Sequence, residues 1–291
     1  MQPEISIESF EIYAKGLDHP ECCAFDGDGV LWAGGEAGQI YKISGDGGVE
    51  EVANVGTFCA GIAFSSDQVL HVCAPALGIV RIERNGKHSV FADACAGRKI
   101  REANFLVFDR NGYLYATDSG EWKGNVGRLM RFSPDGRGID IATGFGYANG
   151  LALSLDENEI FMVESDTDSV HRIELLDGGA RSGTIQVYAE NIGHLPDGLC
   201  LDAEGNLLVT SYGSHEILSV DKQRNVSLVA HDPIGVMLGN PTNVTFGGKN
   251  YDEIYVANLA RWAITRAWLG RKGMPPVNLR NTACDKLGSG N

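Results

Sequence analysis

Residues 149–161 read NGLALSLDENEIF, and this stretch holds the pattern that decides the fold. Leu151 and Leu153 alternate with a smaller residue, a turn rich in Ser, Asp and Asn follows, and a second apolar run opens at Ile160. Short alternating runs separated by such turn residues are typical of antiparallel strands joined by tight turns. The stretch therefore predicts two consecutive β-strands of one sheet.

The same two-strand pattern occurs six times along the chain. Its second strands open near Leu31, Leu70, Leu114, Ile160, Leu207 and Ile254. The first and last of these residues are 223 positions apart, which gives a period of about 45 residues. A repeat of roughly 40–50 residues with four short strands per unit is typical of β-propellers. The sequence therefore predicts an all-β fold, a six-bladed β-propeller of four-stranded antiparallel blades.

The remaining strands and the ends of the chain complete this interpretation. Residues 39–43 and 127–132 read as later strands of their units, and residues 10–14 precede the first unit. We expect the N-terminal run to supply an outer strand to the last blade and so to close the ring. No change in composition divides the chain, so we expect a single propeller domain over residues 1–280. Residues 281–291 are expected to form a flexible tail that resembles vector-derived sequence.

Composition and charge bear on partners and compartment. The net charge is −14, and an acidic chain repels phosphate backbones, so we expect no nucleic-acid partner. No run of 18 apolar residues occurs, so we expect no membrane span. The seven cysteines form no CxxC pair, and the N-terminal residues do not resemble a signal peptide. This pattern predicts reduced thiols in a cytoplasmic protein, and it leaves the oligomeric state open.

The first strands of the six units share one register. Their common apolar anchors are Phe25, Phe64, Phe108, Leu153, Leu201 and Phe246. Four residues before the anchors lie Glu21, Ala60, Asn104, Asn149, Asp197 and Thr242, called the ring positions below. The first strand of a propeller blade lines the central channel, so we expect the ring positions to surround one mouth of that channel.

Four of the six ring positions carry oxygen ligands, namely Glu21, Asn104, Asn149 and Asp197. Two carboxylates balance the charge of one divalent cation, and amide oxygens fill further coordination positions. The competing interpretation is that Asn and Asp begin turns, but it accounts poorly for Glu21. The register therefore predicts one divalent metal ion at the mouth. Calcium is the ion expected first, and zinc, manganese, magnesium or ferrous iron would also accept oxygen ligands.

The chain resembles the family of senescence marker protein (regucalcin), gluconolactonase and luciferin-regenerating enzyme. The motifs that carry this resemblance follow one another at blade spacing: His19-Pro20-Glu21, Ala103-Asn104, Tyr115-Ala116-Thr117-Asp118, Ala148-Asn149-Gly150-Leu151-Ala152, Pro196-Asp197-Gly198-Leu199 and Thr242-Asn243-Val244-Thr245-Phe246-Gly247-Gly248. The resemblance implies a six-bladed propeller and a metal-dependent lactonase or related hydrolase.

The resemblance also implies roles for individual residues. Family ligands match Glu21, Asn149 and Asp197, with Asn104 as a ligand or close to the metal. Asp197 stands at the position of the general base. Arg101 falls where some members hold the substrate. The substrate implied by the resemblance is a small-molecule lactone.

One departure from the family pattern affects the expected substrate. Phe105 follows Asn104, where the family often has Asp, and sugar hydroxyls need polar partners. Phe105, Phe145, Tyr147, Trp122 and Leu195 could build a more apolar pocket, although each could equally be ordinary core. We therefore expect Asn104, Phe105 and Tyr147 to contact a lactone that is less polar than a sugar lactone.

Water activated by a metal, with Asp197 as base, would open a lactone by hydrolysis. Catalysis by a serine nucleophile is disfavoured because no Gly-x-Ser-x-Gly motif occurs. Cys22 is expected to be a buried structural thiol, and His194 a loop residue. Two other functions stay open: a phosphotriesterase-like hydrolase with the same ligands, and a non-enzymatic binding propeller whose metal plugs the channel.

Overall fold

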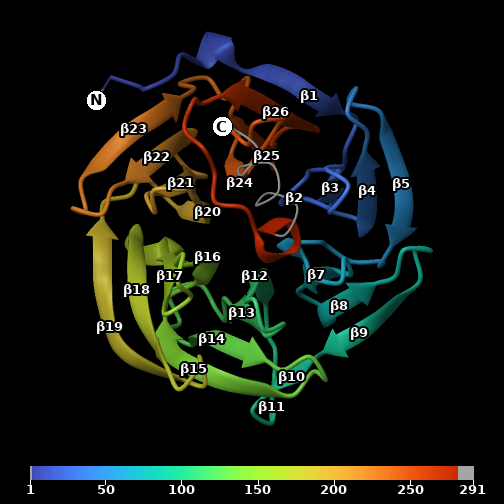
Figure 1. Ribbon diagram of the computed structural model, residues 1–291, viewed down its shortest axis with the longest axis vertical. Coiled ribbons are helices and arrows are strands. Elements are labelled where there is room, and N and C mark those ends of the chain that lie inside the picture. The colour runs from blue at the N-terminus through green and yellow to red at the C-terminus, as the bar shows by residue number, and fades with distance from the viewer. Residues whose placement is uncertain (1, 281–291) are drawn as a thin grey trace, which may run out of the picture.

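The computed structural model describes residues 2–280 and contains six four-stranded antiparallel sheets. The sheets are arranged around one central axis like the blades of a propeller (Figure 1). This confirms the predicted six-bladed propeller. The predicted tail at residues 281–291 lies outside the described residues.

The first three blades occupy the N-terminal half of the chain. Blade 1 contains β2 (Cys23–Phe25), β3 (Leu31–Gly34), β4 (Gln39–Ile43) and β5 (Val49–Asn54). Blade 2 contains β6 (Ile62–Phe64), β7 (Leu70–Ala74), β8 (Gly78–Ile82) and β9 (His88–Ala92). Blade 3 contains β12 (Ala103–Phe108), β13 (Leu114–Asp118), β14 (Gly127–Phe132) and β15 (Gly138–Phe145). A hairpin of β10 (Ala94–Cys95) and β11 (Arg98–Lys99) lies between blades 2 and 3.

The other three blades follow in the same order. Blade 4 contains β16 (Ala148–Leu153), β17 (Glu159–Glu164), β18 (Ser169–Leu176) and β19 (Arg181–Glu190). Blade 5 contains β20 (Pro196–Leu201), β21 (Leu207–Ser211), β22 (Glu216–Val220) and β23 (Val226–His231). Blade 6 contains β24 (Pro241–Gly247), β25 (Glu253–Asn258), β26 (Ala263–Trp268) and β1 (Glu11–Lys15). Three short 3-10 helices are η1 (Ile7–Ser9), η2 (Ser165–Thr167) and η3 (Val277–Leu279).

The N-terminal strand closes the ring, as the sequence predicts. Strand β1 pairs with β26 in antiparallel register, with Glu11 opposite Arg266 and Lys15 opposite Ala263. The last blade therefore combines strands from the two ends of the chain, and its hydrogen bonds to the N-terminal strand close the ring. The predicted strand openings also hold, because β17 and β25 begin one residue before Ile160 and Ile254 and the other four begin at the predicted residue.

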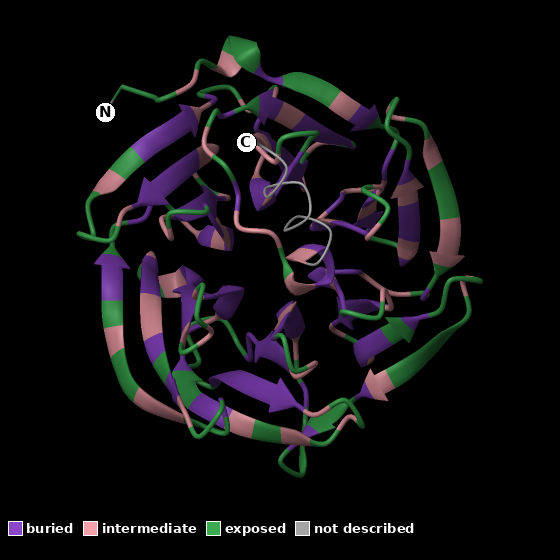
Figure 2. Ribbon diagram, in the orientation of Figure 1, coloured by how far each residue is buried: buried purple, intermediate pink, exposed green. Residues whose placement is uncertain are grey.

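The hydrophobic core lies in the spaces between neighbouring blades rather than inside one layer. The inner strands are almost fully buried, whereas the outer strands carry many exposed and partly exposed residues (Figure 2). Side chains such as Leu31, Leu129 and Ile160 have no exposed surface. Each blade thus covers the faces of its neighbours, and the channel strands are held on both sides.

The C-terminal segment closes one end of the central channel. Helix η3 lies at the axis in Figure 1. The Asn278 side chain donates a hydrogen bond to the carbonyl oxygen of Phe25 at 2.9 Å, and Gln68 donates to the carbonyl of Asn278 at 2.9 Å. Arg280 forms an ion pair with Glu157. The opposite end of the channel, where the innermost strands begin, is called the mouth below.

Two sequence expectations concern other parts of the chain. In the part that the structure describes, no helix is long and apolar enough to cross a membrane. Six cysteines between residues 2 and 280 are free thiols, five of them buried, and Cys284 lies outside this range.

Candidate active site

Four of the six ring positions lie at irregularities of the innermost strands. The pairing register of these strands shifts between Ala103 and Leu106, between Ala148 and Leu151, between Pro196 and Leu199, and between Pro241 and Asn243. A bulge leaves the extra residue unpaired and turns its side chain away from the regular pleat. Three of the predicted ligands, Asn104, Asn149 and Asp197, fall inside these shifts. At these three residues, the common register that the sequence predicts corresponds to the same backbone irregularity in the structure.

The neighbouring blade fixes the backbone of two ring residues. Thr117 of blade 3 donates a hydrogen bond from its hydroxyl to the carbonyl of Asn149 at 3.0 Å. Thr242 of blade 6 donates in the same way to the carbonyl of Glu21 at 2.7 Å. Because an adjacent blade fixes these carbonyl groups, the backbone of Asn149 and of Glu21 is held in place. Their side chains therefore extend from defined positions.

Glycines let the innermost strands approach closely below the ring. A Cβ atom on Gly61 would lie 2.6 Å from the carbonyl oxygen of Asn104, and one on Gly150 would lie 2.4 Å from that of Asp197. Real Cβ atoms do not come so near, so larger residues would force the strands apart. The innermost strands are therefore held close together just below the ring.

Thr117 and Asp118, the last residues of β13, hold the chain on both sides of Asn104. Asp118 accepts a hydrogen bond from the backbone N–H of Glu102 at 2.9 Å, and the Thr117 hydroxyl accepts one from that of Phe105 at 3.0 Å. Asp118 itself is buried and forms an ion pair with the guanidinium group of Arg128. These contacts explain why Thr and Asp occur together in this motif.

Glu21 and Asp197 lie close enough together for the charge of Glu21 to affect the pKa of Asp197. Burial raises the pKa of Glu21 to about 7. Burial raises the pKa of Asp197 well above its ordinary value, the negative charge of Glu21 raises it further, and a hydrogen bond from Asn149 opposes both effects. Within residues 2–280, no basic side chain lowers the pKa of either carboxyl group. Two partly buried carboxylates without a cationic partner are unfavourable as a charged pair.

Two ring oxygens have no hydrogen-bond partner in the described chain. These buried atoms are Oε2 of Glu21 and Oδ1 of Asn149. An unpartnered buried acceptor costs free energy. A cation would coordinate both of these oxygen atoms and would also balance the charges of the Glu21 and Asp197 carboxylates. Carboxylate and amide oxygens are hard ligands that suit calcium, magnesium or manganese. The donor set at the mouth therefore fits a divalent cation.

The metal-free protein is expected to lose stability as the pH rises from about 4.5 to about 7. In this range folded Glu21 keeps its proton because its pKa is raised to about 7, whereas the unfolded chain ionises near 4.5. The folded state then binds more protons than the unfolded state, so the free energy of unfolding falls with increasing pH.

Thermal unfolding at pH 5, 6 and 7 with a chelator measures this effect. Added calcium should flatten the dependence because the cation favours ionised carboxylates in the folded state. The variant Glu21→Gln, which cannot titrate, should show a weaker dependence in chelator. Equal stability of the chelated wild type at pH 5 and 7 would argue against the shifted pKa.

Rim residues, defined as those two positions before the ring, have unusual backbone conformations in four blades. The φ angles are 45° for His19, 55° for Tyr147, 55° for Leu195 and 51° for Asn240. Positive φ is uncommon for residues other than glycine, and for large side chains it costs free energy of order 1–3 kcal/mol. Such backbone strain persists only where neighbouring residues hold the chain in place. Contacts within the folded protein therefore stabilise the rim of the mouth.

Hydrogen bonds hold Tyr147 in this conformation at the mouth. Its hydroxyl donates to Oε1 of Glu102 at 2.8 Å, and its carbonyl accepts from the backbone N–H of Ser165 at 3.2 Å. Burial raises the pKa of the Tyr147 phenol, and Glu102, Asp197 and Glu21 raise it further. The tyrosine therefore stays neutral beside the two ring carboxylates. Glu102 and Tyr147 are the rim residues of blades 3 and 4, and their contact joins these adjacent blades at the rim.

The other predicted substrate residues lie in different environments. Arg101 has 64% of its side-chain surface exposed, and its guanidinium is 3.9 Å from Glu121. Phe105 is buried in the core between blades and lines the channel below the ring. Trp122 is exposed and contacts the edge of the Tyr147 ring, with centroids 5.2 Å apart. The structure thus brings Tyr147 to the mouth with the ring residues, and it places Phe105 beneath them.

Comparison with known proteins places this geometry in a family. The family model described as "SMP-30/Gluconolactonase/LRE-like region" matches residues 19–260, a range that includes every ring position. The chain belongs to this family. The resemblance expected from the sequence motifs is therefore confirmed.

Curated relatives of this family member include lactonases. Lactonase drp35 of Staphylococcus saprophyticus is 34% identical over 140 residues, which is 45% of this chain and 40% of that protein. Lactonase drp35 of Staphylococcus aureus is 36% identical over 126 residues, which is 40% of this chain and 38% of that protein. The chain thus matches about two fifths of the length of these relatives.

Solved structures share the fold of this family member at low sequence identity. A gluconolactonase from Xanthomonas campestris has a TM-score of 0.78 and 20% identity, with 89% of each chain covered. The calcium-binding protein regucalcin from Agrobacterium tumefaciens has a TM-score of 0.78 and 16% identity, with 95% of this chain and 98% of that chain covered. At these identities the likeness establishes the propeller fold alone.

Sequence reasoning missed Tyr212 of this family member. The pKa of its phenol is raised by burial and by the charges of Glu21 and Asp197, which places the ring near the mouth. Its backbone N–H donates to the carbonyl of Leu195, a rim residue, at 3.0 Å. The signal was available, because Tyr212 directly follows the second strand of its blade, and Ser165 in blade 4 makes the same contact to Tyr147.

Cys22 and His194 adopt the roles expected from the sequence. Cys22 is 2% exposed, and burial raises the pKa of its thiol to about 12, so it is not a thiolate at neutral pH. His194 lies in the loop before β20 with 64% of its side chain exposed, 3.8 Å from Asp168.

A second group of side chains at the surface has the composition of a metal site. Asp18, His19 and Glu36 place one donor atom each within 4.8 Å of one another, but all three are partly or fully exposed. His19 Nδ1 bonds to Asp18, and Nε2 accepts a hydrogen bond from the indole of Trp262 at 3.0 Å. Both imidazole nitrogens of His19 therefore have partners in this structure, and His19 connects a loop of blade 1 to a loop of blade 6.

Proposed function

We propose that this chain is a metal-dependent lactonase that opens a cyclic ester by attack of water. The observation that supports this most is the pair of ring carboxylates, Glu21 and Asp197, beside an unpartnered amide oxygen of Asn149. Both carboxylates are partly buried and have no cationic partner within residues 2–280. The lactonases among the curated relatives support the reaction class.

Four ring residues would hold the metal. Glu21, Asn149 and Asp197 are proposed as ligands, and Asn104 as a ligand or a neighbour of the metal. When bound, a divalent cation polarises an ester carbonyl and lowers the pKa of a coordinated water molecule. Calcium is the proposed ion because all four donors are oxygen atoms and two of them are neutral amides. Zinc, manganese, magnesium and ferrous iron are the alternatives.

Asp197 is proposed as the general base. It is partly exposed towards the mouth, so a water molecule can reach its carboxylate. A hydrogen bond from Asn149 orients this carboxylate and favours its ionised form. During hydrolysis the proton removed from water must finally reach the lactone oxygen that leaves the acyl carbon, and Asp197 would accept this proton and then deliver it.

The rim residues are proposed to select the lactone. Trp122 offers an exposed aromatic surface against Tyr147, and Phe105 brings no polar group to the mouth. Such a surface favours a lactone with an apolar substituent over a polyhydroxylated sugar lactone. Arg101, exposed beside this surface, is proposed to contact the substrate carbonyl or a polar substituent.

A panel of sugar, aliphatic and aromatic lactones, assayed with calcium, magnesium, manganese and zinc, tests the proposal. We expect hydrolysis that disappears with a chelator, returns with one of these metals and is fastest for an aliphatic or aromatic lactone. A phosphotriester in the same panel tests the related hydrolase reaction. Loss of thermal stability in chelator without turnover of any lactone would favour a binding propeller instead.

A further inference from the structure

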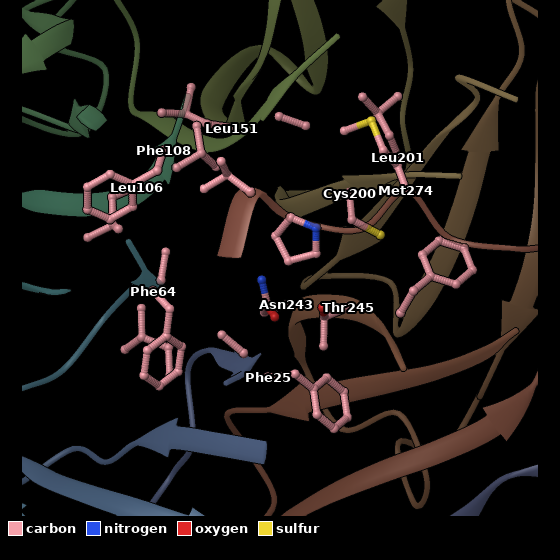
Figure 3. Close-up of a pocket in the computed structure, with 18 of the residues that line it drawn as sticks. Phe25, Phe64, Leu106, Phe108, Leu151, Cys200, Leu201, Asn243, Thr245 and Met274 are labelled. Carbon is pink, nitrogen blue, oxygen red and sulfur yellow. The ribbon is translucent and has the colours of Figure 1, made fainter. Parts of the chain in front are cut away.

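The channel contains a cavity on the side of the ring that faces the closed end. Its volume is about 140 Å³. All six apolar anchors of the sequence repeat line it: Phe25, Phe64, Phe108, Leu153, Leu201 and Phe246. Met274 and Asn278 of the C-terminal segment also line it, and Figure 3 shows Met274 beside Leu201. Because each anchor follows its ring position by four residues, the anchors lie about 13 Å further along the channel.

The cavity is separate from the candidate active site. None of the four proposed metal ligands lines it. Between the ring and the anchors, Gly61, Gly150 and Gly198 bring neighbouring strands so close that a Cβ atom would lie 2.4–2.6 Å from the next backbone. The innermost strands thus narrow the channel between its two ends. The apolar cavity is therefore a distinct compartment, and a lactone at the mouth does not occupy it.

Two polar groups from β24 face this compartment, and the metal site uses neither. Asn243 is 3% exposed, and its Oδ1 accepts a hydrogen bond from the backbone N–H of Cys23 at 3.4 Å. Within residues 2–280, neither Nδ2 of Asn243 nor the hydroxyl of Thr245 has a hydrogen-bond partner. Both side chains lie beside the cavity in Figure 3. Unpartnered polar groups in an apolar cavity favour a ligand that can bond to them.

We propose that this cavity binds a small neutral molecule with a cyclic hydrocarbon body and one oxygen atom, such as a phenol. An apolar protein cavity of about 150 Å³ can hold benzene, so the volume suits a single six-membered ring. The hydroxyl of such a ligand can accept from Asn243 and bond with Thr245. Charged ligands fit poorly, because Arg280, the one basic side chain among the described residues that line the cavity, already pairs with Glu157.

Binding of 4-fluorophenol to the full-length protein, followed by ¹⁹F NMR, tests this proposal, with fluorobenzene as the matched ligand without the hydroxyl. We expect saturable binding of 4-fluorophenol that is tighter than binding of fluorobenzene. Thr245→Val keeps the shape of the side chain and removes its hydroxyl. This variant should reduce the preference for the phenol by about fivefold, the value of one net hydrogen bond.

The repeat itself provides a blocking variant. Four of the six anchors are phenylalanine, so Leu153→Phe introduces the residue that other blades already carry at this position. We expect it to abolish binding of both ligands while the thermal unfolding temperature and activity at the mouth stay near those of the wild type. Leu201→Phe is a second variant if the first does not fold. Absence of saturable binding to the wild type, or equal binding to a folded blocking variant, would overturn the proposal.

Discussion

Asp197→Asn is expected to lower the rate of lactone hydrolysis by roughly 10²–10⁴-fold, the usual loss when a positioned general base is removed. The substitution preserves the size of the side chain, so the bulged start of β20 should keep its geometry. It removes the proton-accepting group and leaves the hydrogen bond partner Asn149 in place. The single-turnover rate and kcat on the best lactone of the panel are the measurements.

Weaker metal binding is the main confounding effect, because the ring loses one of its two carboxylates. Rates are therefore measured at saturating metal, with metal occupancy determined in the same samples. Arg101→Ala is the contrast: its exposed side chain lies outside the ring, so we expect a larger change in KM than in kcat. A fully metal-loaded Asp197→Asn protein that hydrolyses lactone at the wild-type rate would rule out Asp197 as the base.

Glu21→Gln is expected to lose most of the bound metal after dialysis and, with it, most of the hydrolytic activity. The substitution removes one of two anionic ligands and half of the charge that balances a divalent ion. The carbonyl of Glu21 remains bonded to Thr242, so the strand should stay in place. Elemental analysis of wild type and variant, dialysed together without chelator, measures the effect.

Glu102→Gln is the matched control for this experiment. Its carboxylate also lies at the mouth, but it accepts a hydrogen bond from Tyr147 and stands at a rim position instead of a ring position. We expect this variant to keep its metal. Equal metal content in Glu21→Gln and wild type would show that the ring does not bind the ion, whereas equal losses in both variants would point to the charge of the whole mouth.

The fold and the candidate ring could be predicted because each repeat carries its own register. The apolar anchors are recognisable in every unit, and a ring residue is found by counting back four positions from its anchor. Strand bulges keep this count constant in the structure, since Asn104, Asn149 and Asp197 all fall inside equivalent register shifts. Local pattern and global geometry therefore agree at these positions.

Features that depend on contacts between distant segments could not be predicted in this way. The bond between His19 and Trp262 joins residues 243 positions apart, and the closure of the channel by Asn278 joins residues 253 positions apart. The positive φ of Tyr147 could not be predicted from the sequence. A positive φ is usually inferred from glycine or asparagine, and an aromatic residue gives no such indication. Tyr212 occupies the same repeat position as Ser119 and Ser165, so the period locates the position, but the change of residue type hides its place beside the ring.

The most direct measurement of the central claim is anomalous X-ray scattering from crystals grown with manganese. The account predicts one strong peak at the mouth of the channel, within coordination distance of oxygen atoms of Glu21, Asn149 and Asp197. A peak only at the surface group of Asp18, His19 and Glu36, with none at the ring, would contradict it.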